Sequence, residues 1–148
     1  MAAQSKSPSF VSKGVTVDDL NQLSKNNMVE HLGIVFTEVG EDYISATLPV
    51  DKRTHQPYGL LHGGASVALA ETLGSMAAAL CVDRTRQYCV GLEINANHVK
   101  SAREGIVTGT TRPIHIGKRT QVWEIKIVNP QNELISISRI TMAVIDKK

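Results

Sequence analysis

Aromatic residues and unbalanced charge are both scarce in this sequence. Aromatics make up 4% of the 148 residues, too few for the stacking platforms that bind single-stranded nucleic acids. The 16 Lys and Arg residues face 14 Asp and Glu residues, for a formal net charge of only +2. No concentrated basic face, and hence no nucleic-acid partner, is expected. The five histidines show no HExxH or paired-ligand spacing, so no metal site is predicted.

Cysteine is also rare, and the N-terminal residues lack a long apolar run. Cys81 and Cys89 have no CxxC spacing and lie among apolar residues, so we expect buried thiols in a reducing compartment. A disulfide between them is the alternative. Residues 1–14 lack the apolar core of a secretory signal and are expected to form a flexible tail. These features favour a cytoplasmic protein.

One apolar stretch, residues 62–81, is about as long as a membrane span. It contains His62, Glu71 and Ser75, and it has no flanking aromatic belts. A charged residue at the centre of a span costs about 2.5–3.5 kcal/mol on insertion scales. We therefore predict a buried helix and no membrane partner.

Alternating apolar residues predict strands on both sides of this helix. The predicted order is a helix over 15–28, a turn at 29–32, strands over 34–39 and 43–49, the long helix over 62–81, and strands over 88–99, 105–115, 119–128 and 134–145. In the strand after the helix, Val90, Leu92, Ile94 and Ala96 are expected to share one face. Tight turns favour antiparallel pairing, and a helix that is apolar nearly all round must be covered on most sides. The predicted fold is α+β: one domain over residues 15–148, in which a curved antiparallel sheet wraps a central helix and a second subunit completes the cover.

Glu71 is the one formal charge inside the predicted helix. A carboxylate in an apolar setting is costly unless something stabilises it, so such a residue has a polar cleft, a partner or a catalytic role. From this feature alone, a functional glutamate and a glutamate satisfied at a subunit interface are equally favoured.

The neighbours of Glu71 favour catalysis. Ser75 is four residues later and Gly64 is seven residues earlier, so both share the helical face of Glu71. Gly63 and Gly64 open the helix, where free N–H groups stabilise developing negative charge, and His62 stands just before them. Such amides can polarise a thioester carbonyl while the carboxylate acts as a general base or as a nucleophile. Both routes remain open.

Other polar residues have weaker claims to a role. Gln56, in the loop before the helix, can supply a further donor to the same carbonyl, although an ordinary solvated loop residue is the simpler interpretation. Four basic residues near predicted strand ends can hold the phosphates of coenzyme A or simply guard sheet edges: Lys100, Arg103, Lys118 and Arg119.

Two runs of sequence resemble a known family. The run Gln56–Ser66 (QPYGLLHGGAS), followed by Glu71 and Ser75, resembles the phenylacetate-type subgroup of hotdog-fold thioesterases. The later runs 91–99 (GLEINANHV) and 101–105 (SAREG) are similar to the branch that includes 1,4-dihydroxy-2-naphthoyl-CoA thioesterases and the enterobactin-pathway proofreading thioesterases. The similarity extends from about residue 20 to residue 145.

The resemblance implies a fold, an activity and a set of site residues. It implies a hotdog fold, dimers in which the two sheets join, active sites at the dimer interface, and a homotetramer built as a dimer of dimers. The implied substrates are aromatic acyl-CoAs or aryl groups on a carrier protein. The first candidate is 1,4-dihydroxy-2-naphthoyl-CoA of menaquinone biosynthesis. No cofactor is implied beyond the coenzyme A of the substrate. The implied catalytic residues are Glu71, Gln56, His62, Gly63 and Ser75. The implied substrate-binding residues are Gly64, His98, Ser101, Ala102 and Arg103.

Two other functions stay open. A hotdog dehydratase or hydratase would use a similar helical carboxylate with a histidine, but that family usually has a Pro-Gly pair where this chain has Gly63 and Gly64. A non-catalytic acyl-CoA-binding module is the second alternative, since a fold alone does not specify catalysis. A pure binding role would leave the predicted burial of Glu71 without a reason.

Overall fold

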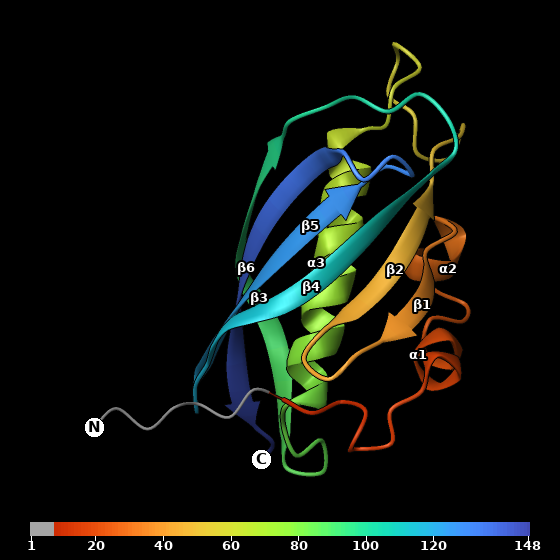
Figure 1. The fold of residues 1–148 in the computed structure, drawn as a ribbon. Coiled ribbons are helices and arrows are strands. Elements are labelled where there is room, and N and C mark those ends of the chain that lie inside the picture. Colours follow the sequence, from red (N-terminus) through yellow and green to blue (C-terminus); the bar gives the residue numbers. More distant parts are fainter. Residues whose placement is uncertain (1–7) are drawn as a thin grey trace.

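The computed structural model describes residues 8–148, and the first half of the predicted N-terminal tail lies outside this range (Figure 1). The helices are α1 (Val17–Leu23), α2 (Met28–His31) and α3 (Gly63–Leu80), and the strands are β1 (Val35–Val39), β2 (Ile44–Pro49), β3 (Gln87–His98), β4 (Ile106–Ile116), β5 (Thr120–Val128) and β6 (Leu134–Asp146). The strands and the long helix therefore fall within one or two residues of their predicted bounds. No helix in residues 8–148 is long and apolar enough to cross a membrane.

The first predicted helix is shorter than expected. A capping box starts α1, because the Thr16 side chain accepts from the Asp19 amide while the Asp19 carboxylate accepts from the Thr16 amide. The helix ends at Leu23, and Asn26 then adopts a left-handed conformation with φ of 59°. That conformation cannot continue a right-handed helix, so the chain begins again as the separate helix α2.

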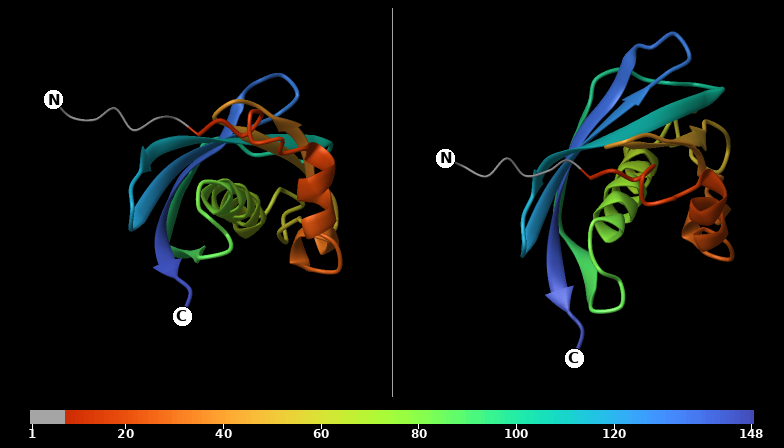
Figure 2. Two further views of the ribbon diagram at one scale, coloured as in Figure 1. Left: turned by 90° about the horizontal axis from the view of Figure 1, so that it is seen from below. Right: turned by 60° about the horizontal axis from the view of Figure 1, so that its bottom comes forward.

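All six strands form a single antiparallel sheet in the order β1-β2-β4-β5-β6-β3. The sheet curves round α3, which lies along its concave face (Figures 1 and 2). This is the α+β hotdog fold that the sequence predicted. The order leaves β1 at one edge of the sheet and β3 at the other.

The core lies between α3 and the concave face of the sheet. Trp123, Ile125 and Ile127 share the inner face of β5, and all three are fully buried. The absence of a side chain at Gly74 lets the helix approach the sheet, since a Cβ there would lie 2.4 Å from Ile140 Cγ2. The buried face of α3 is made largely of small residues, so the helix packs close to β6.

A β-bulge alters the predicted face of β3. The pairing of β3 with β6 shifts register between Gly91 and Glu93, so one extra residue is inserted at this point. Ile94 and Ala96 are half-buried on the inner side, but Val90 and Leu92 are 41% and 62% exposed. The prediction that all four share one face is therefore wrong, because strict alternation does not survive an inserted residue.

Part of the predicted N-terminal tail packs against the domain. Phe10 is fully buried and stacks on Trp123, with ring centroids 6.3 Å apart. The Phe10 amide donates to the Glu41 carbonyl oxygen at 2.9 Å, and the Lys13 ammonium donates to the Leu80 carbonyl oxygen at the end of α3. Residues 8–14 thus close the end of the core where α3 finishes.

Candidate active site

Glu71 lies on the side of α3 that faces β3, and its carboxylate rests against the bulge in that strand. A Cβ placed on Gly91 would be only 2.7 Å from Glu71 Oε1, so the bare backbone at Gly91 makes room for the carboxylate. Among residues 8–148, Glu71 has no ion-pair partner and no hydrogen-bond partner, and its side chain is only half-buried. The carboxylate is therefore available to act on a bound molecule.

The N-terminal end of α3 offers one free amide where the sequence predicted two. His62 is the N-cap residue, and its Nδ1 accepts a hydrogen bond of 2.8 Å from the Gly64 amide. The Gly64 amide is thus occupied by the cap. The Gly63 amide has no acceptor within residues 8–148, and it lies at the positive end of the helix dipole. The single free donor at this end is therefore the Gly63 N–H.

The free amide and the carboxylate are far apart in one subunit. Gly63 and Glu71 are eight residues apart on the same helix, which corresponds to a rise of about 12 Å. An oxyanion donor must lie about 3 Å from the carbonyl oxygen, and a base must reach the same group directly or through one water. One thioester carbonyl therefore cannot touch both groups of one subunit.

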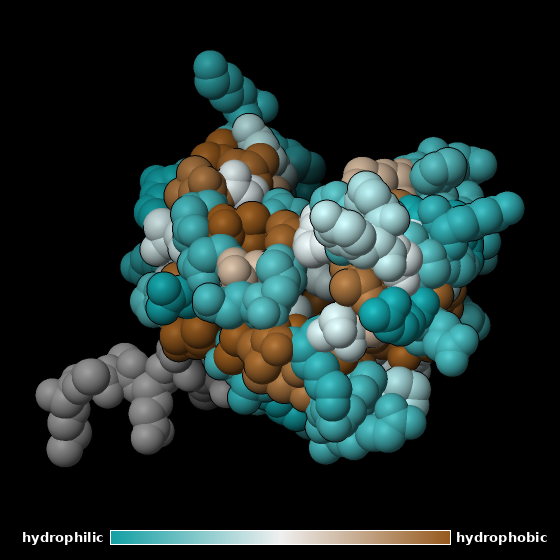
Figure 3. All heavy atoms as spheres, turned by 90° about the horizontal axis from the view of Figure 1, so that it is seen from above, coloured by the Kyte–Doolittle hydropathy of each residue, from teal (hydrophilic) through white to brown (hydrophobic). Residues whose placement is uncertain are grey.

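A cavity of about 320 Å³ opens beside the N-terminal end of α3. The predicted site residues that line it are Gln56, Gly63, His98, Ser101 and Ala102. The ring of His98 closes onto the helix, since a Cβ at position 63 would lie 2.7 Å from His98 Nε2. Figure 3 looks onto this end of the molecule and shows apolar patches interleaved with hydrophilic ones.

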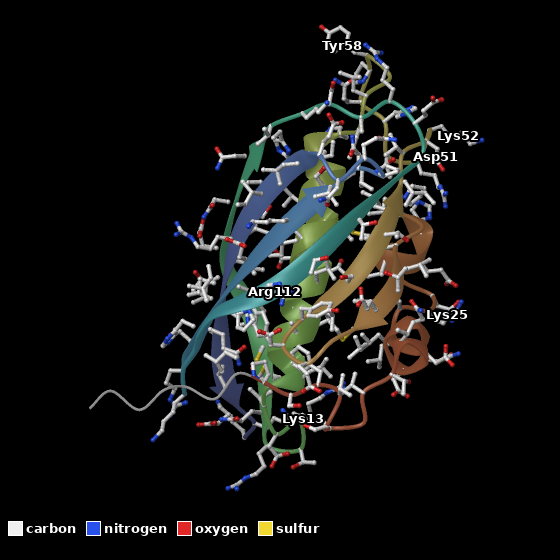
Figure 4. All side chains as sticks on the ribbon, viewed as in Figure 1. Lys13, Lys25, Asp51, Lys52, Tyr58 and Arg112 are labelled. Carbon is white, nitrogen blue, oxygen red and sulfur yellow. The ribbon has the colours of Figure 1, made fainter. Side chains whose placement is uncertain are left out.

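The loop before α3 orients Gln56. Gln56 Oε1 accepts a hydrogen bond from the Tyr58 amide, so the side-chain NH₂ group is the part left free to donate to a ligand. The Leu61 amide donates to the Ala102 carbonyl oxygen at 2.8 Å, which ties this loop to the segment after β3. In Figure 4, Tyr58 marks the tip of the loop and Asp51 lies at its base.

The base of this loop is held by a charged turn. Asp51 accepts from the Arg53 backbone amide and from its guanidinium, with the closest contact 2.7 Å. These hydrogen bonds lower the pKa of Asp51 to about 2. Thr54, which is buried, donates to the Pro49 carbonyl oxygen at 2.6 Å. Asp51 and Thr54 therefore hold the base of the loop that carries Gln56, and the Asp51 carboxylate is ionised at neutral pH.

Five of the ten predicted site residues do not line the cavity: Glu71, His62, Gly64, Ser75 and Arg103. Ser75 is half-buried one turn beyond Glu71, with its Oγ 4.0 Å from Met142 Sδ. The side chain of Arg103 is exposed, although the Arg103 carbonyl oxygen contacts His55 Nε2 at 2.9 Å. Neither residue reaches the Gly63 amide in this subunit.

The four basic residues near the strand ends fall into two groups, those in ion pairs and those without one. Lys100 and Arg119 are engaged in ion pairs with Glu133 and Asp146, while Lys118 and Arg103 form no ion pair within residues 8–148.

Both cysteines are free thiols, and burial raises the pKa of Cys81 to about 11. Within residues 8–148 no three side chains of His, Cys, Asp or Glu gather as a metal site would require.

The sequence did not single out several residues of the cavity. The apolar lining comprises Leu60, Leu61, Val99 and Ile135, and Ser66 adds a hydroxyl. Leu60 and Leu61 sit within the motif that carries the resemblance, so their position was a usable signal. Ile135 gave no such signal, because only the pairing of β6 beside β3 brings it to this end of α3.

The fold and the helical glutamate together define a family of thioester hydrolases. Residues 58–136 match the model of the Thioesterase superfamily, which is more than half of the chain. The chain belongs to this family and is an acyl-CoA thioesterase with the hotdog fold.

Individual relatives support the same assignment over most of the chain. A Vibrio cholerae protein that carries only the general name of esterase is 58% identical over 136 residues. The match covers 92% of this chain and 90% of that protein. The 1,4-dihydroxy-2-naphthoyl-CoA hydrolase of Escherichia coli is 53% identical over 131 residues, or 88% of this chain and 96% of that enzyme. A crystal structure of a mutant thioesterase from Pseudomonas aeruginosa matches with a TM-score of 0.88 at 49% identity, covering 90% of this chain and 96% of that one.

Proposed function

We propose that this enzyme hydrolyses an aromatic acyl-CoA, with Glu71 as the general base or the nucleophile. The first candidate substrate is 1,4-dihydroxy-2-naphthoyl-CoA, the compound in the name of the Escherichia coli relative, which would place the enzyme in cytoplasmic menaquinone biosynthesis. The observation that carries the proposal is the Glu71 carboxylate, which has no partner in residues 8–148 and rests against Gly91. A structural role does not account for a partly desolvated carboxylate without a partner, which favours a functional one.

Each active site is assembled from two subunits. The rise of about 12 Å between Gly63 and Glu71 prevents both from serving one carbonyl within a subunit. Both residues face the β3 side of the molecule, where the sheet has an unpaired edge. A second copy that adds its β3 to this edge brings its own Gly63 amide towards Glu71. Two such dimers form the tetramer.

The residues then divide the work of hydrolysis. The Gly63 amide of one subunit, with Gln56 and His62, polarises the thioester carbonyl and stabilises the oxyanion. Glu71 of the other subunit removes a proton from water as hydroxide adds to the carbonyl carbon, and Ser75 positions that water. The C–S bond then breaks, and the coenzyme A thiolate takes up the proton from Glu71. In the alternative route, Glu71 attacks the carbonyl carbon itself, the C–S bond breaks, and the coenzyme A thiolate leaves and takes a proton from solvent. Water then hydrolyses the resulting anhydride, which releases the free acid and restores the Glu71 carboxylate.

Thiol release from a panel of aliphatic and aromatic acyl-CoAs tests this function. Glu71→Gln keeps the size of the side chain and removes its basicity, so we expect kcat to fall by about 10²–10⁴ while the protein stays folded. Glu71→Ala should lose at least as much. Full activity in a folded Glu71→Gln protein would refute the assignment of Glu71.

The Gly63 amide has a matched pair of variants of its own. Gly63 is the first residue of α3, where proline is tolerated, and His62 already has the extended conformation that proline requires before it. Gly63→Pro removes the N–H, whereas Gly63→Ala adds a Cβ but keeps the N–H. We expect kcat of the proline variant to be about 10²–10³ below that of the alanine variant. Equal activities would mean that this amide is not an oxyanion donor.

A further inference from the structure

Basic side chains gather at the end of the molecule opposite the active-site cavity, although charge is nearly balanced over the whole chain. Figure 1 shows that α3 finishes at this end, where the C terminus also lies, and begins at the other. Two cavities here, of about 640 and 430 Å³, share Gln87 and Asp146 in their linings. The basic residues that line them, called the basic end below, are Arg86, Lys118, Arg119, Lys147 and Lys148.

Two cations of the basic end are free to bind an anion. The two aspartates in the cavity linings, at positions 83 and 146, accept hydrogen bonds of 2.6–3.0 Å from Thr85, Gln87 and Arg119. The side chains of Arg86 and Lys118 are exposed, and neither forms an ion pair within residues 8–148. The local acids therefore do not neutralise them.

Pairing at the β3 edge places the basic end of one subunit beside the cavity of the other. Within one subunit the 12 residues of β3 separate the two by about 36 Å, too far for the pantetheine arm of coenzyme A to bridge. In a symmetric pair every contact between two residues is repeated with the subunits exchanged, so two joined β3 strands run antiparallel. Arg86, just before β3, then lies near residues 98–102 of the other subunit, which line its cavity.

The spacing along β3 also suits coenzyme A. Glu71 rests against Gly91, and the five residues of extended chain from Gly91 back to Arg86 cover about 17 Å. An extended pantetheine arm covers a distance of this order between the thioester sulfur and the first phosphate. A thioester held between Glu71 of one subunit and the Gly63 amide of the other can therefore place its phosphates at the basic end of the subunit that supplies Glu71.

We propose that Arg86 and Lys118 bind the phosphate groups of the coenzyme A nucleotide, in the active site to which the same subunit contributes Glu71. The inference rests on the proposed thioesterase function and on pairing at the β3 edge. A guanidinium group presents paired N–H donors that match phosphate oxygens, and an ammonium group adds a compact positive charge. The basic end thus selects substrates by their carrier, because the acyl group itself has no phosphate.

The test compares benzoyl-CoA with benzoyl-pantetheine, which has the same thioester and no phosphate. In Arg86→Gln/Lys118→Gln we expect KM for benzoyl-CoA to rise by about 10–100-fold with kcat unchanged, because two charge-assisted hydrogen bonds are lost. The kinetics of benzoyl-pantetheine should match wild type. Lys25→Gln/Arg112→Gln is the matched control, since it removes the same charge from residues that pair with Glu30 and Asp42, and should leave both substrates unaffected.

Hybrid dimers show whether the basic end acts together with the Glu71 of its own subunit. Gly63→Pro protein is dissociated, mixed with the Arg86→Gln/Lys118→Gln variant and reassociated. In a hybrid, the one site with an intact Gly63 takes both Glu71 and the basic end from the Gly63→Pro subunit, where both are intact. A component with the wild-type KM should therefore appear. If the basic end instead serves the Gly63 of its own subunit, that site keeps the raised KM, which would contradict the proposed arrangement.

The remaining outcomes separate the phosphate site from the enzyme itself. Unchanged KM for benzoyl-CoA in Arg86→Gln/Lys118→Gln, or an equal rise for benzoyl-pantetheine, would overturn the phosphate site and leave the thioesterase function intact. A rise in KM confined to an acyl group on an acidic carrier protein would also overturn it, and would assign the basic end to a protein partner. No thiol release from any acyl-CoA by wild type would overturn the proposed function.

Discussion

The two edges of the sheet are built in opposite ways. At one edge, β1 has five residues, carries a register shift between Phe36 and Glu38, and is covered by α1. Asn21 of α1 occupies the free edge by donating to the Phe36 carbonyl oxygen and accepting from the Phe36 amide. At the other edge, β3 has 12 residues and no strand on its outer side within residues 8–148, and Val90 and Leu92 are exposed along it.

The difference predicts that the β3 edge, and not the β1 edge, pairs with a second subunit. Proteins blunt sheet edges with short strands, bulges and covering elements, and β1 has all three. A long, uncovered edge with apolar side chains is a template for pairing. Because Glu71 and Gly63 lie beside β3, the edge that stays open is also the edge beside which the proposed catalytic residues lie. Pairing and catalysis are therefore expected to fail together.

Charges placed on the β3 edge should have the largest effect. Val90→Lys combined with Leu92→Lys sets like charges against each other in a symmetric pair, so we expect monomers and a loss of activity of at least about 100-fold. Light scattering and thiol release measure the two effects. Val35→Lys is the control, because Val35 is 48% exposed on β1 and should change neither. A β3 variant that is monomeric, correctly folded and still active would show that catalysis does not depend on pairing at the β3 edge.

A methyl group at the β3 bulge should have a smaller effect. In Gly91→Ala, the new Cβ would lie 2.7 Å from Glu71 Oε1, so the carboxylate must move. The end of a flexible side chain moves at little cost in stability, but displacement by about 1 Å can lower the rate by about 10²-fold. We expect kcat to fall by about 10–100-fold while subunits stay associated. Unchanged kcat would show that Glu71 does not act from this position.

Removal of the cover on β1 should affect stability alone. Asn21→Ala deletes hydrogen bonds of 3.0 Å and 2.9 Å to the backbone of Phe36, which is buried. The unpaired backbone groups should lower the free energy of unfolding by about 1–3 kcal/mol, measured by urea denaturation. Thiol release per folded molecule should not change, and a large loss of activity would mean that β1 also serves the site.

The smallest effect concerns the thiol at the end of α3. Burial raises the pKa of Cys81 from its ordinary value of 9.0 to about 11, so roughly one molecule in a thousand holds the thiolate at pH 8. Alkylation of Cys81 should be slow at pH 8 and should accelerate as the pH approaches 11. Because the folded-state pKa is the higher one, the contribution of this thiol to stability is present below pH 9 and is lost as the pH rises towards 11. Rapid labelling at pH 8 would contradict the burial.

Much of the fold follows from local sequence patterns. The long helix and the strands appear at their predicted positions, because hydrophobic periodicity is a local property. The bulge at Gly91 was missed, because an inserted residue changes the register without any local signal in the alternation around Leu92. The strand order was also not predictable, since the pairing of β6 with both β3 and β5 depends on long-range contacts.

The type of site could be predicted from the sequence, but its hydrogen-bond geometry could not. Glu71 stood out as one charge in an apolar helix, and the structure leaves it unpaired within residues 8–148. The hydrogen bond from the Gly64 amide to His62 Nδ1 depends on the rotamer of the His62 side chain. The spacing of residues in the sequence does not determine that rotamer. Similarly, Arg86 and Lys118 are distant in the sequence, and only the fold brings them to one end of the molecule.

Subunit mixing is the most direct test of a site shared across the β3 edge. Glu71→Ala and Gly63→Pro proteins, each nearly inactive alone, are dissociated, mixed in equal amounts and reassociated. In a hybrid dimer one site combines an intact Glu71 with an intact Gly63 from the other subunit, so random pairing should restore about a quarter of wild-type thiol release. If the two residues serve the same site from one subunit, every site lacks one of them, and activity should stay at the level of the separate variants.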